Sequence, residues 1–317
     1  MNLQGARLIT HIANELEEFI EAVDAAAKQR QIDGLEWSVE FARSSLEALG
    51  KFAQEPQIVS KIKDTIVCTD EYDIPVRIYQ PINNNDCYPV MIYFHGGGHM
   101  CGSIAIYDKI CRRMANETGH IVISVDYRLS PEFMYPAGLN DCLTVVQNIE
   151  SLLEDFNVDL QRLVLAGDSA GGNNAASVVY QMHLSGDIRI SKLLLIYPEL
   201  DLMMSSDSYH RYAHGFLLET VKIKWFFDHY IDEVNDRQRI SPLYFPKKEL
   251  FPETMIVAAG LDPLVDEGRI FCEQLNSSGG NCEYLIEPDL IHAFFTLDKL
   301  IPLQIERVYR KINNFLE

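Results

Sequence analysis

The stretch Leu163–Gly172, which reads LVLAGDSAGG, constrains the fold of this chain more than any other. Four apolar residues lead into a G-x-S-x-G pattern centred on Ser169, and small, helix-compatible residues follow it. Such a pattern places a serine on a sharp turn between a strand and a helix, with its hydroxyl at the end of a sheet. The helix expected over 170–184 points its N-terminal N–H groups at the same spot. An ordinary glycine-rich turn is the alternative, but the flanking strand and helix patterns favour a nucleophile.

Short apolar runs alternate with helical patterns through most of the chain. A hairpin of strands at 60–68 and 74–80 is expected first. Buried strands follow at 89–94, 121–127, 162–166, 192–197 and 254–260, with a last strand at 283–287. Helices are expected between them at 107–117, 141–153, 170–184 and 266–277, and a closing helix at 303–316. This α/β alternation predicts a mostly parallel central sheet covered by helices on both faces, with the site at the carboxyl ends of the strands.

Two regions lie outside this alternation. Residues 1–28 and 35–52 have apolar residues at helical spacing, and 199–240 is a long, aromatic-rich insertion with a helical pattern around 220–231. Plain core packing would explain the N-terminal helices, but an insertion of this size between two strands is typical of a lid. We expect a single domain over 1–317, with a helical cap contributed by 1–52 and 199–240.

A serine nucleophile needs a general base, and a base of this kind needs an acid to orient it. His292 is the histidine after Ser169 that lies in a loop following a strand of the resumed sheet, and Asp262 directly follows the strand at 254–260. Both positions are at the expected carboxyl edge. Four other carboxylates lie close by in the sequence: Asp266, Glu267, Glu287 and Asp289. Position at a strand end favours Asp262.

Acyl transfer also needs N–H donors for the oxyanion. His95-Gly96-Gly97-Gly98 follows the strand at 89–94, and consecutive glycines allow bare backbone N–H groups to approach a substrate. The N–H of Ala170 is the expected second donor. A phosphate-binding loop is the rival interpretation, but neither the P-loop nor the dinucleotide spacing is present.

The composition excludes several classes of protein. The chain has 46 acidic and 27 basic residues, a net charge of −19 and no basic cluster, so we expect neither nucleic acid nor an anionic membrane as a partner. No apolar run is long enough to span a membrane and no signal peptide is evident, which predicts a cytoplasmic protein. No C-x-x-C occurs, so the seven cysteines are expected to be reduced, small core residues rather than zinc ligands.

Seven motifs occur in order between about residues 90 and 294: HGGG, DYRLSPE, YPAGLND, GDSAGG, YPELD, DPLVDEG and HAF. In this order they resemble the hormone-sensitive-lipase-like α/β-hydrolases, and specifically the bacterial acetyl esterases. The resemblance implies an α/β-hydrolase fold with a two-part cap. It also implies a Ser169, Asp262 and His292 triad. The oxyanion donors that it implies are Gly96, Gly97, Gly98 and Ala170.

The expected function is that of a serine carboxylesterase, which cleaves small acetyl to butyryl esters through an acyl-enzyme. Neither a metal nor an organic cofactor is expected, and the partner is a small-molecule ester, with the chain a monomer or homodimer and no protein partner indicated. An amidase or deacetylase, or a ligand-binding homologue without activity, are the alternatives. His99 departs from the family, which usually has an aromatic or large apolar residue after the glycines, and this bears on substrate preference.

Overall fold

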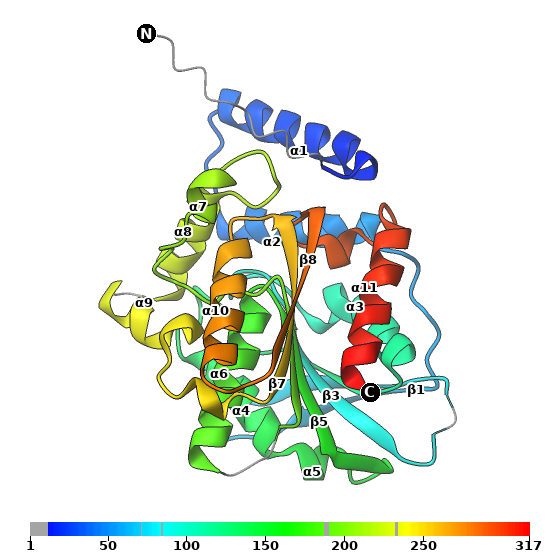
Figure 1. Cartoon of the computed structure of the whole chain (residues 1–317). Helices are drawn as coiled ribbons and strands as arrows, with labels where there is room; N and C mark the ends of the chain where they lie inside the picture. Colours follow the sequence, from blue (N-terminus) through cyan, green and yellow to red (C-terminus); the bar gives the residue numbers. More distant parts are fainter. Residues whose placement is uncertain (1–11, 71, 84, 187–189, 232–233) are drawn as a thin grey trace.

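The central sheet carries the architecture (Figure 1). The computed structural model describes residues 12–70, 72–83, 85–186, 190–231 and 234–317, and within them eight strands form one sheet in the order β1-β2-β4-β3-β5-β6-β7-β8. β1 and β2 are antiparallel, β2 is antiparallel to β4, and all other pairs are parallel, so the predicted mostly parallel sheet is confirmed. The strands are β1 (Lys61–Val67), β2 (Ile74–Gln80), β3 (Tyr88–Phe94), β4 (Ile121–Val125), β5 (Val158–Asp168), β6 (Lys192–Ile196), β7 (Glu253–Leu261) and β8 (Cys282–Ile291).

The helices fall close to the predicted ranges. They are α1 (Asn14–Ile32), α2 (Val39–Leu49), α3 (Ile104–Thr118), α4 (Ala137–Gln147), α5 (Ile149–Leu152), α6 (Ala170–Ser185), α7 (Ser208–Arg211), α8 (Thr220–Tyr230), α9 (Val234–Ile240), α10 (Val265–Ser277) and α11 (Pro302–Leu316). The described residues also contain four short 3-10 helices: η1 (Gly50–Phe52), η2 (Pro242–Tyr244), η3 (Lys248–Leu250) and η4 (Phe294–Leu297). The predicted helix at 141–153 is wrong in its bounds, because α4 begins earlier and Asn148 separates it from α5. Residues 1–11 of the predicted N-terminal helix lie outside the described residues.

Helices cover both faces of the sheet. Figure 1 shows α3 and α11 on one face and α4, α6 and α10 on the other. Two apolar clusters fill the layers, and neighbouring residues of β3 belong to different ones: Ile92 packs with the α4, α6 and α10 side, and Met91 with the α3 and α11 side. Successive side chains of a strand point to opposite faces. This two-sided burial explains why the sequence shows continuous apolar runs instead of alternation.

The N-terminal helices and the segment 199–240 border the same end of the sheet. Side chains of α2, of the residues after β3, and of α8 pack into one small apolar cluster that includes Ala42, Met100 and Phe226. Arg43 on α2 attaches this helix to the body. Its guanidinium forms two hydrogen bonds, of 2.8 and 2.6 Å, to the carboxylate of Glu132, and its Nε donates to the Met100 carbonyl at 3.1 Å.

The cysteines differ from the expectation of seven reduced core residues. Cys272 on α10 and Cys282 at the start of β8 form a disulfide, with their Cα atoms 5.4 Å apart. Cys68 and Cys87 are free and exposed, whereas the three other free cysteines (Cys101, Cys111 and Cys142) are buried as predicted. The expectation is therefore wrong for four of the seven. The disulfide ties α10 to the strand that follows it.

Candidate active site

Ser169 lies at the turn between β5 and α6, at the carboxyl edge of the sheet. Its φ of 54° and ψ of −122° belong to a region that residues with a side chain rarely adopt. The turn is held by neighbouring elements: the Ser169 N–H donates to the Ile196 carbonyl of β6 at 3.0 Å. Gly171 permits the close approach of α6 to β3, because a Cβ at this position would collide with the Phe94 carbonyl. The glycine and the strained serine together form the sharp turn that the pattern predicts.

The structure brings Ser169, Asp262 and His292 together from the ends of β5, β7 and β8. His292 Nε2 lies 2.9 Å from Ser169 Oγ, and His292 Nδ1 lies 2.7 Å from Asp262 Oδ2. All three are buried, with exposed fractions of 8%, 0% and 6%. An imidazole held between a hydroxyl and a carboxylate can take the hydroxyl proton while the carboxylate fixes its tautomer.

The other nearby carboxylates have different partners. Asp266, in the first turn of α10, forms an ion pair with Arg211 at 2.7 Å, and Glu287 forms one with Arg307. Glu267 is fully buried and accepts the Leu200 N–H at 2.5 Å and the Tyr209 hydroxyl at 2.8 Å. The Asp289 side chain is partly buried, and its backbone carbonyl accepts a hydrogen bond from the N–H that precedes α1. Asp262 is the carboxylate that reaches the imidazole.

The glycine loop, defined as His95–Gly98, follows β3 and lies beside the serine. The Gly96 N–H donates to Asp168 Oδ1 at 2.9 Å, so this glycine anchors the loop, and the expectation that its N–H is an oxyanion donor is wrong. The carbonyl of Gly97 accepts the N–H groups of Met100 and Cys101, which turns the chain back on itself. Ala170 is the first residue of α6, and no preceding helical turn can accept its N–H.

Asp168 was not singled out in the sequence, although it is the residue directly before the serine. Its carboxylate is buried and accepts the hydroxyls of Tyr93 at 2.8 Å and Tyr107 at 3.0 Å in addition to the Gly96 N–H. Burial raises the pKa of Asp168 to about 6, and the hydrogen bonds from the two tyrosines and the glycine oppose this rise. The only indication in the sequence was that Asp168 occupies the second position of the G-x-S-x-G motif, directly before the nucleophile.

His95 and His99 flank the three glycines and are both buried. The His95 ring stacks on Tyr127, with ring centres 4.4 Å apart, and burial lowers its pKa, so it is neutral at pH 7. His99 Nε2 lies 3.0 Å from Oε1 of Glu199, which is also buried. The sequence indicated that His99 was unusual but gave no indication of its partner.

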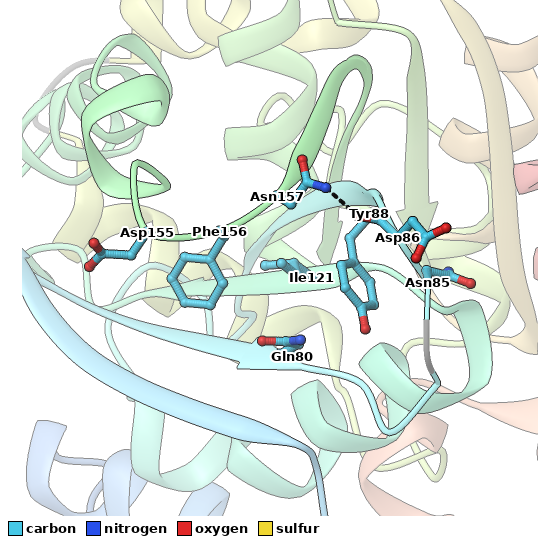
Figure 2. Close-up of a pocket in the computed structure, with 8 residues that line it drawn as sticks. All are labelled: Gln80, Asn85, Asp86, Tyr88, Ile121, Asp155, Phe156 and Asn157. Atoms are coloured by element: carbon cyan, nitrogen blue, oxygen red, sulfur yellow. Dashed lines mark hydrogen bonds between the residues drawn. The ribbon is translucent and has the colours of Figure 1, made fainter.

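A separate cavity of about 320 Å³ lies at the opposite, amino-terminal edge of the parallel strands (Figure 2). Figure 2 shows Phe156, Ile121 and Tyr88 lying in a row, with Gln80 facing them. The full lining is Gln80, Asn85, Asp86, Tyr88, Ile121, Asp155, Phe156 and Asn157. It contains neither a histidine nor a serine, so it lacks the residues needed for acyl transfer.

Two searches for other kinds of site concern the described residues alone. Among them, no group of three or more His, Cys, Asp or Glu side chains is arranged to hold a metal ion. No helix in the same residues is both long and apolar enough to cross a bilayer.

Comparison with known proteins identifies the family of this chain. A model described as alpha/beta hydrolase fold matches residues 91–296, which is more than half of the chain and includes the glycine loop, Ser169, Asp262 and His292. The chain belongs to the α/β-hydrolase family. A second model, described as platelet-activating factor acetylhydrolase, isoform II, matches residues 42–132, a region that contains the glycine loop but not the triad.

Relatives of this α/β hydrolase cover almost its whole length. An ethyl acetate hydrolase of Pseudomonas putida is 30% identical, with 90% of this chain and 91% of the relative covered. The carboxylesterase NlhH of Mycobacterium tuberculosis is 32% identical, covering 86% and 87%. Among solved structures, a mutant α/β hydrolase enzyme from the metagenome of Lake Arreo, Spain, superimposes with a TM-score of 0.88 at 30% identity, covering 96% of this chain and 98% of the other.

Proposed function

We propose that this α/β hydrolase is a serine carboxylesterase that cleaves small, short-acyl esters through an acyl-enzyme. The observation that carries the proposal is the continuous hydrogen-bonded series from Ser169 Oγ through His292 to Asp262. The curated relatives named above are ester hydrolases, which supports the substrate class. The same residues could cleave an amide, and the experiment below includes that possibility.

In the first half-reaction, Ser169 Oγ attacks the ester carbonyl carbon and its proton passes to His292 Nε2. Asp262, hydrogen-bonded to Nδ1 at 2.7 Å, stabilises the imidazolium that forms. The carbonyl oxygen becomes an oxyanion, and we assign its donors to the N–H groups of Gly97, Gly98 and Ala170. Collapse of the tetrahedral intermediate breaks the C–O bond, and His292 returns the proton to the leaving alcohol.

In the second half-reaction, water attacks the acyl-enzyme and the same groups act in the same order. His292 takes a proton from the water, the oxyanion forms again at the same donors, and the bond to Ser169 Oγ breaks. The serine regains its proton from His292, and the carboxylic acid leaves. Each proton taken is returned, so the residues of this chain suffice for the cycle.

The short acyl chain follows from an aromatic ring at the glycine loop. Phe226 on α8 lies so close to Gly98 that a Cβ on this glycine would be 2.7 Å from the ring. In this proposal, residues 1–52 and 199–240 form a cap on one catalytic domain spanning 1–317. We infer that a ring this close to the glycine loop limits the room for the acyl chain and favours acetyl to butyryl groups over long chains.

The proposed setting is the cytoplasm, with a small-molecule ester as the partner, no nucleic acid or membrane, and a monomeric or homodimeric chain. Two exposed free thiols, Cys68 and Cys87, support a reducing compartment, whereas the disulfide between Cys272 and Cys282 does not. The net charge of −19 supports the absence of nucleic acid.

The test is a panel of chromogenic acetyl, butyryl, hexanoyl and octanoyl esters with matched amides, assayed on wild type and Ser169→Ala. We expect ester turnover that exceeds amide turnover, labelling of Ser169 by an organophosphonate, and a loss of about 10⁶-fold in kcat in the variant. Preferential amide cleavage would make the protein an amidase. No turnover and no labelling would leave a ligand-binding homologue.

A further inference from the structure

A buried acid–imidazole pair lies beside the proposed triad and is not part of it. His99 directly follows the glycine loop, with a left-handed φ of 57°, and its side chain is 2% exposed. Its Nε2 lies 3.0 Å from Oε1 of Glu199, whose side chain is 5% exposed. A buried carboxylate requires a donor, and a buried imidazole N–H requires an acceptor. Each residue therefore depends on the other to be buried there.

Glu199 is also bonded to the backbone of the nucleophile. Its N–H donates to the Ser169 carbonyl at 3.1 Å. A connected path thus leads from the Ser169 carbonyl through Glu199 to His99, the residue next to Gly98. On the other side of the glycine loop, Asp168 binds the Gly96 N–H at 2.9 Å. Asp168 is covalently bonded to Ser169, and Glu199 is hydrogen-bonded to it. Both ends of the glycine loop are therefore attached to a direct neighbour of Ser169.

We propose that His99 and Glu199 are a positioning pair, which sets the distance between the oxyanion donors and Ser169 Oγ. This inference rests on the serine mechanism proposed above. In this role neither side chain contacts the reacting atoms. Their hydrogen bond fixes the end of the glycine loop that Asp168 does not hold. Oxyanion donors contribute through their placement, and a displacement of about 1 Å costs on the order of 100-fold in rate.

Other contacts of His99 allow the hydrogen bond to be separated from packing. The ring lies parallel to that of Tyr230 on α8, with centres 3.8 Å apart and an interplanar angle of 1°. The His99 carbonyl accepts the N–H and the hydroxyl of Ser130, at 2.8 and 3.0 Å. These contacts involve the face of the ring and the backbone carbonyl, and they are separate from the hydrogen bond to Glu199. A variant that keeps the ring and loses the donor therefore tests the pair alone.

Two substitutions at the same position provide this test. His99→Phe keeps an aromatic ring against Tyr230 but cannot donate to Glu199. His99→Gln loses the ring but offers an amide N–H to the carboxylate. We expect kcat on a butyryl ester to fall about 10- to 100-fold in His99→Phe with KM changed less than about threefold, and most of this loss to be recovered in His99→Gln. The rate of labelling by an organophosphonate, which forms a tetrahedral adduct, should fall with kcat.

His120→Phe is the matched control for loss of a buried histidine. His120 is 2% exposed and precedes β4 at the opposite edge of the sheet, where its Nδ1 lies 2.9 Å from the Thr118 carbonyl. If His120→Phe and His99→Phe lower Tm by similar amounts, a loss of kcat in His99→Phe alone is due to positioning and not to general destabilisation. We expect the control to keep wild-type kcat.

The outcomes distinguish a positioning role of His99 and Glu199 from a role in packing alone. Full activity in His99→Phe, or a greater loss in His99→Gln than in His99→Phe, would overturn the positioning pair in favour of packing. An equal loss in His120→Phe would also overturn it. If His99→Phe does not fold, the double variant His99→Phe/Glu199→Leu removes the unpaired carboxylate and should show the same kcat loss. An active, unlabelled Ser169→Ala would instead reject the serine mechanism itself, and the two failures are therefore distinguishable.

Discussion

Asp168 Oδ1 accepts the backbone N–H of Gly96 at 2.9 Å, which attaches the glycine loop to the residue before Ser169. The same carboxylate accepts the hydroxyls of Tyr93 and Tyr107. Three donors, one each from β3, the glycine loop and α3, thus converge on one buried acid. The attachment determines where the loop lies relative to the nucleophile, and it makes the local geometry depend on the ionisation of Asp168.

The first prediction concerns stability and pH. The pKa of Asp168 is raised to about 6 in the folded protein, above the value of about 4 of an unfolded aspartate. The folded state therefore binds this proton more tightly. The resulting stabilisation is present below pH 4 and is lost as the pH rises to about 6. The contribution of Asp168 to the free energy of unfolding, measured with urea, should therefore be about 2 kcal/mol smaller at pH 7 than at pH 4.5.

Asp168→Asn isolates this contribution because both proteins share every other titrating group. We expect the difference between the two unfolding free energies to change by about 2 kcal/mol between pH 4.5 and pH 7. Parallel pH profiles would show that Asp168 titrates normally in the folded protein.

The second prediction is the identity of the acid that serves His292. Asp262→Asn removes the acceptor that lies 2.7 Å from His292 Nδ1 and should lower kcat by about 10⁴-fold without unfolding the protein. Asp289→Asn is the matched control from the strand that leads to the histidine, and its kcat should change less than about tenfold. The assignment is rejected if the control, and not Asp262→Asn, abolishes turnover.

The third prediction concerns acyl-chain length. Phe226 covers Gly98, so Phe226→Ala opens space at the glycine loop. We expect kcat/KM for octanoyl esters, relative to acetyl esters, to rise at least about tenfold, since one or two methylenes are each worth about 1–3 kcal/mol in an apolar pocket. Phe245→Ala is the control: it deletes a ring that stacks on Tyr180, with centres 4.6 Å apart, and not on the glycine loop. An unchanged preference in Phe226→Ala would place the acyl chain elsewhere.

The fourth prediction separates charge from hydrogen bonding at Glu267. Complete burial raises the pKa of Glu267 well above its usual range, which favours the neutral form of the side chain. Glu267→Gln keeps an acceptor for the Leu200 N–H and should change the unfolding free energy by less than about 1 kcal/mol. Glu267→Ala removes the acceptor of the Leu200 N–H and the shorter of the two hydrogen bonds of the Tyr209 hydroxyl, and it leaves a cavity, so it should cost about 3 kcal/mol. Equal losses in both variants would indicate a charged glutamate.

The sheet and the strand ends at which Ser169, Asp262 and His292 lie could be predicted from the sequence because they depend on local patterns. Buried parallel strands read as continuous apolar runs, and Asp262 directly follows one of them. Two interactions could not be predicted. The bond from Asp168 to Gly96 and the pair of His99 with Glu199 join residues 72 and 100 positions apart. Only the strand order brings these segments together, because β3, β5 and β6 are neighbours in the sheet.

The disulfide was not predicted either, although its two cysteines are close together in the sequence. Cys272 and Cys282 are only ten residues apart, but no C-x-x-C motif marks them as a pair. The pair forms because the chain reverses direction between α10 and β8, so that residues on either side of the turn face each other. Helix boundaries were also misplaced where a helix begins after a proline, as α4 does.

The backbone of Ser169 has a consequence for the history of such a chain. A φ of 54° with a ψ of −122° costs a residue with a side chain roughly 1–3 kcal/mol, and glycine is free of that cost. Ser169→Gly would therefore yield a more heat-resistant protein that has lost its nucleophile. Selection for turnover alone keeps the serine in place against this gradient. Where turnover is no longer under selection, replacement of this serine by glycine would therefore be favoured by stability.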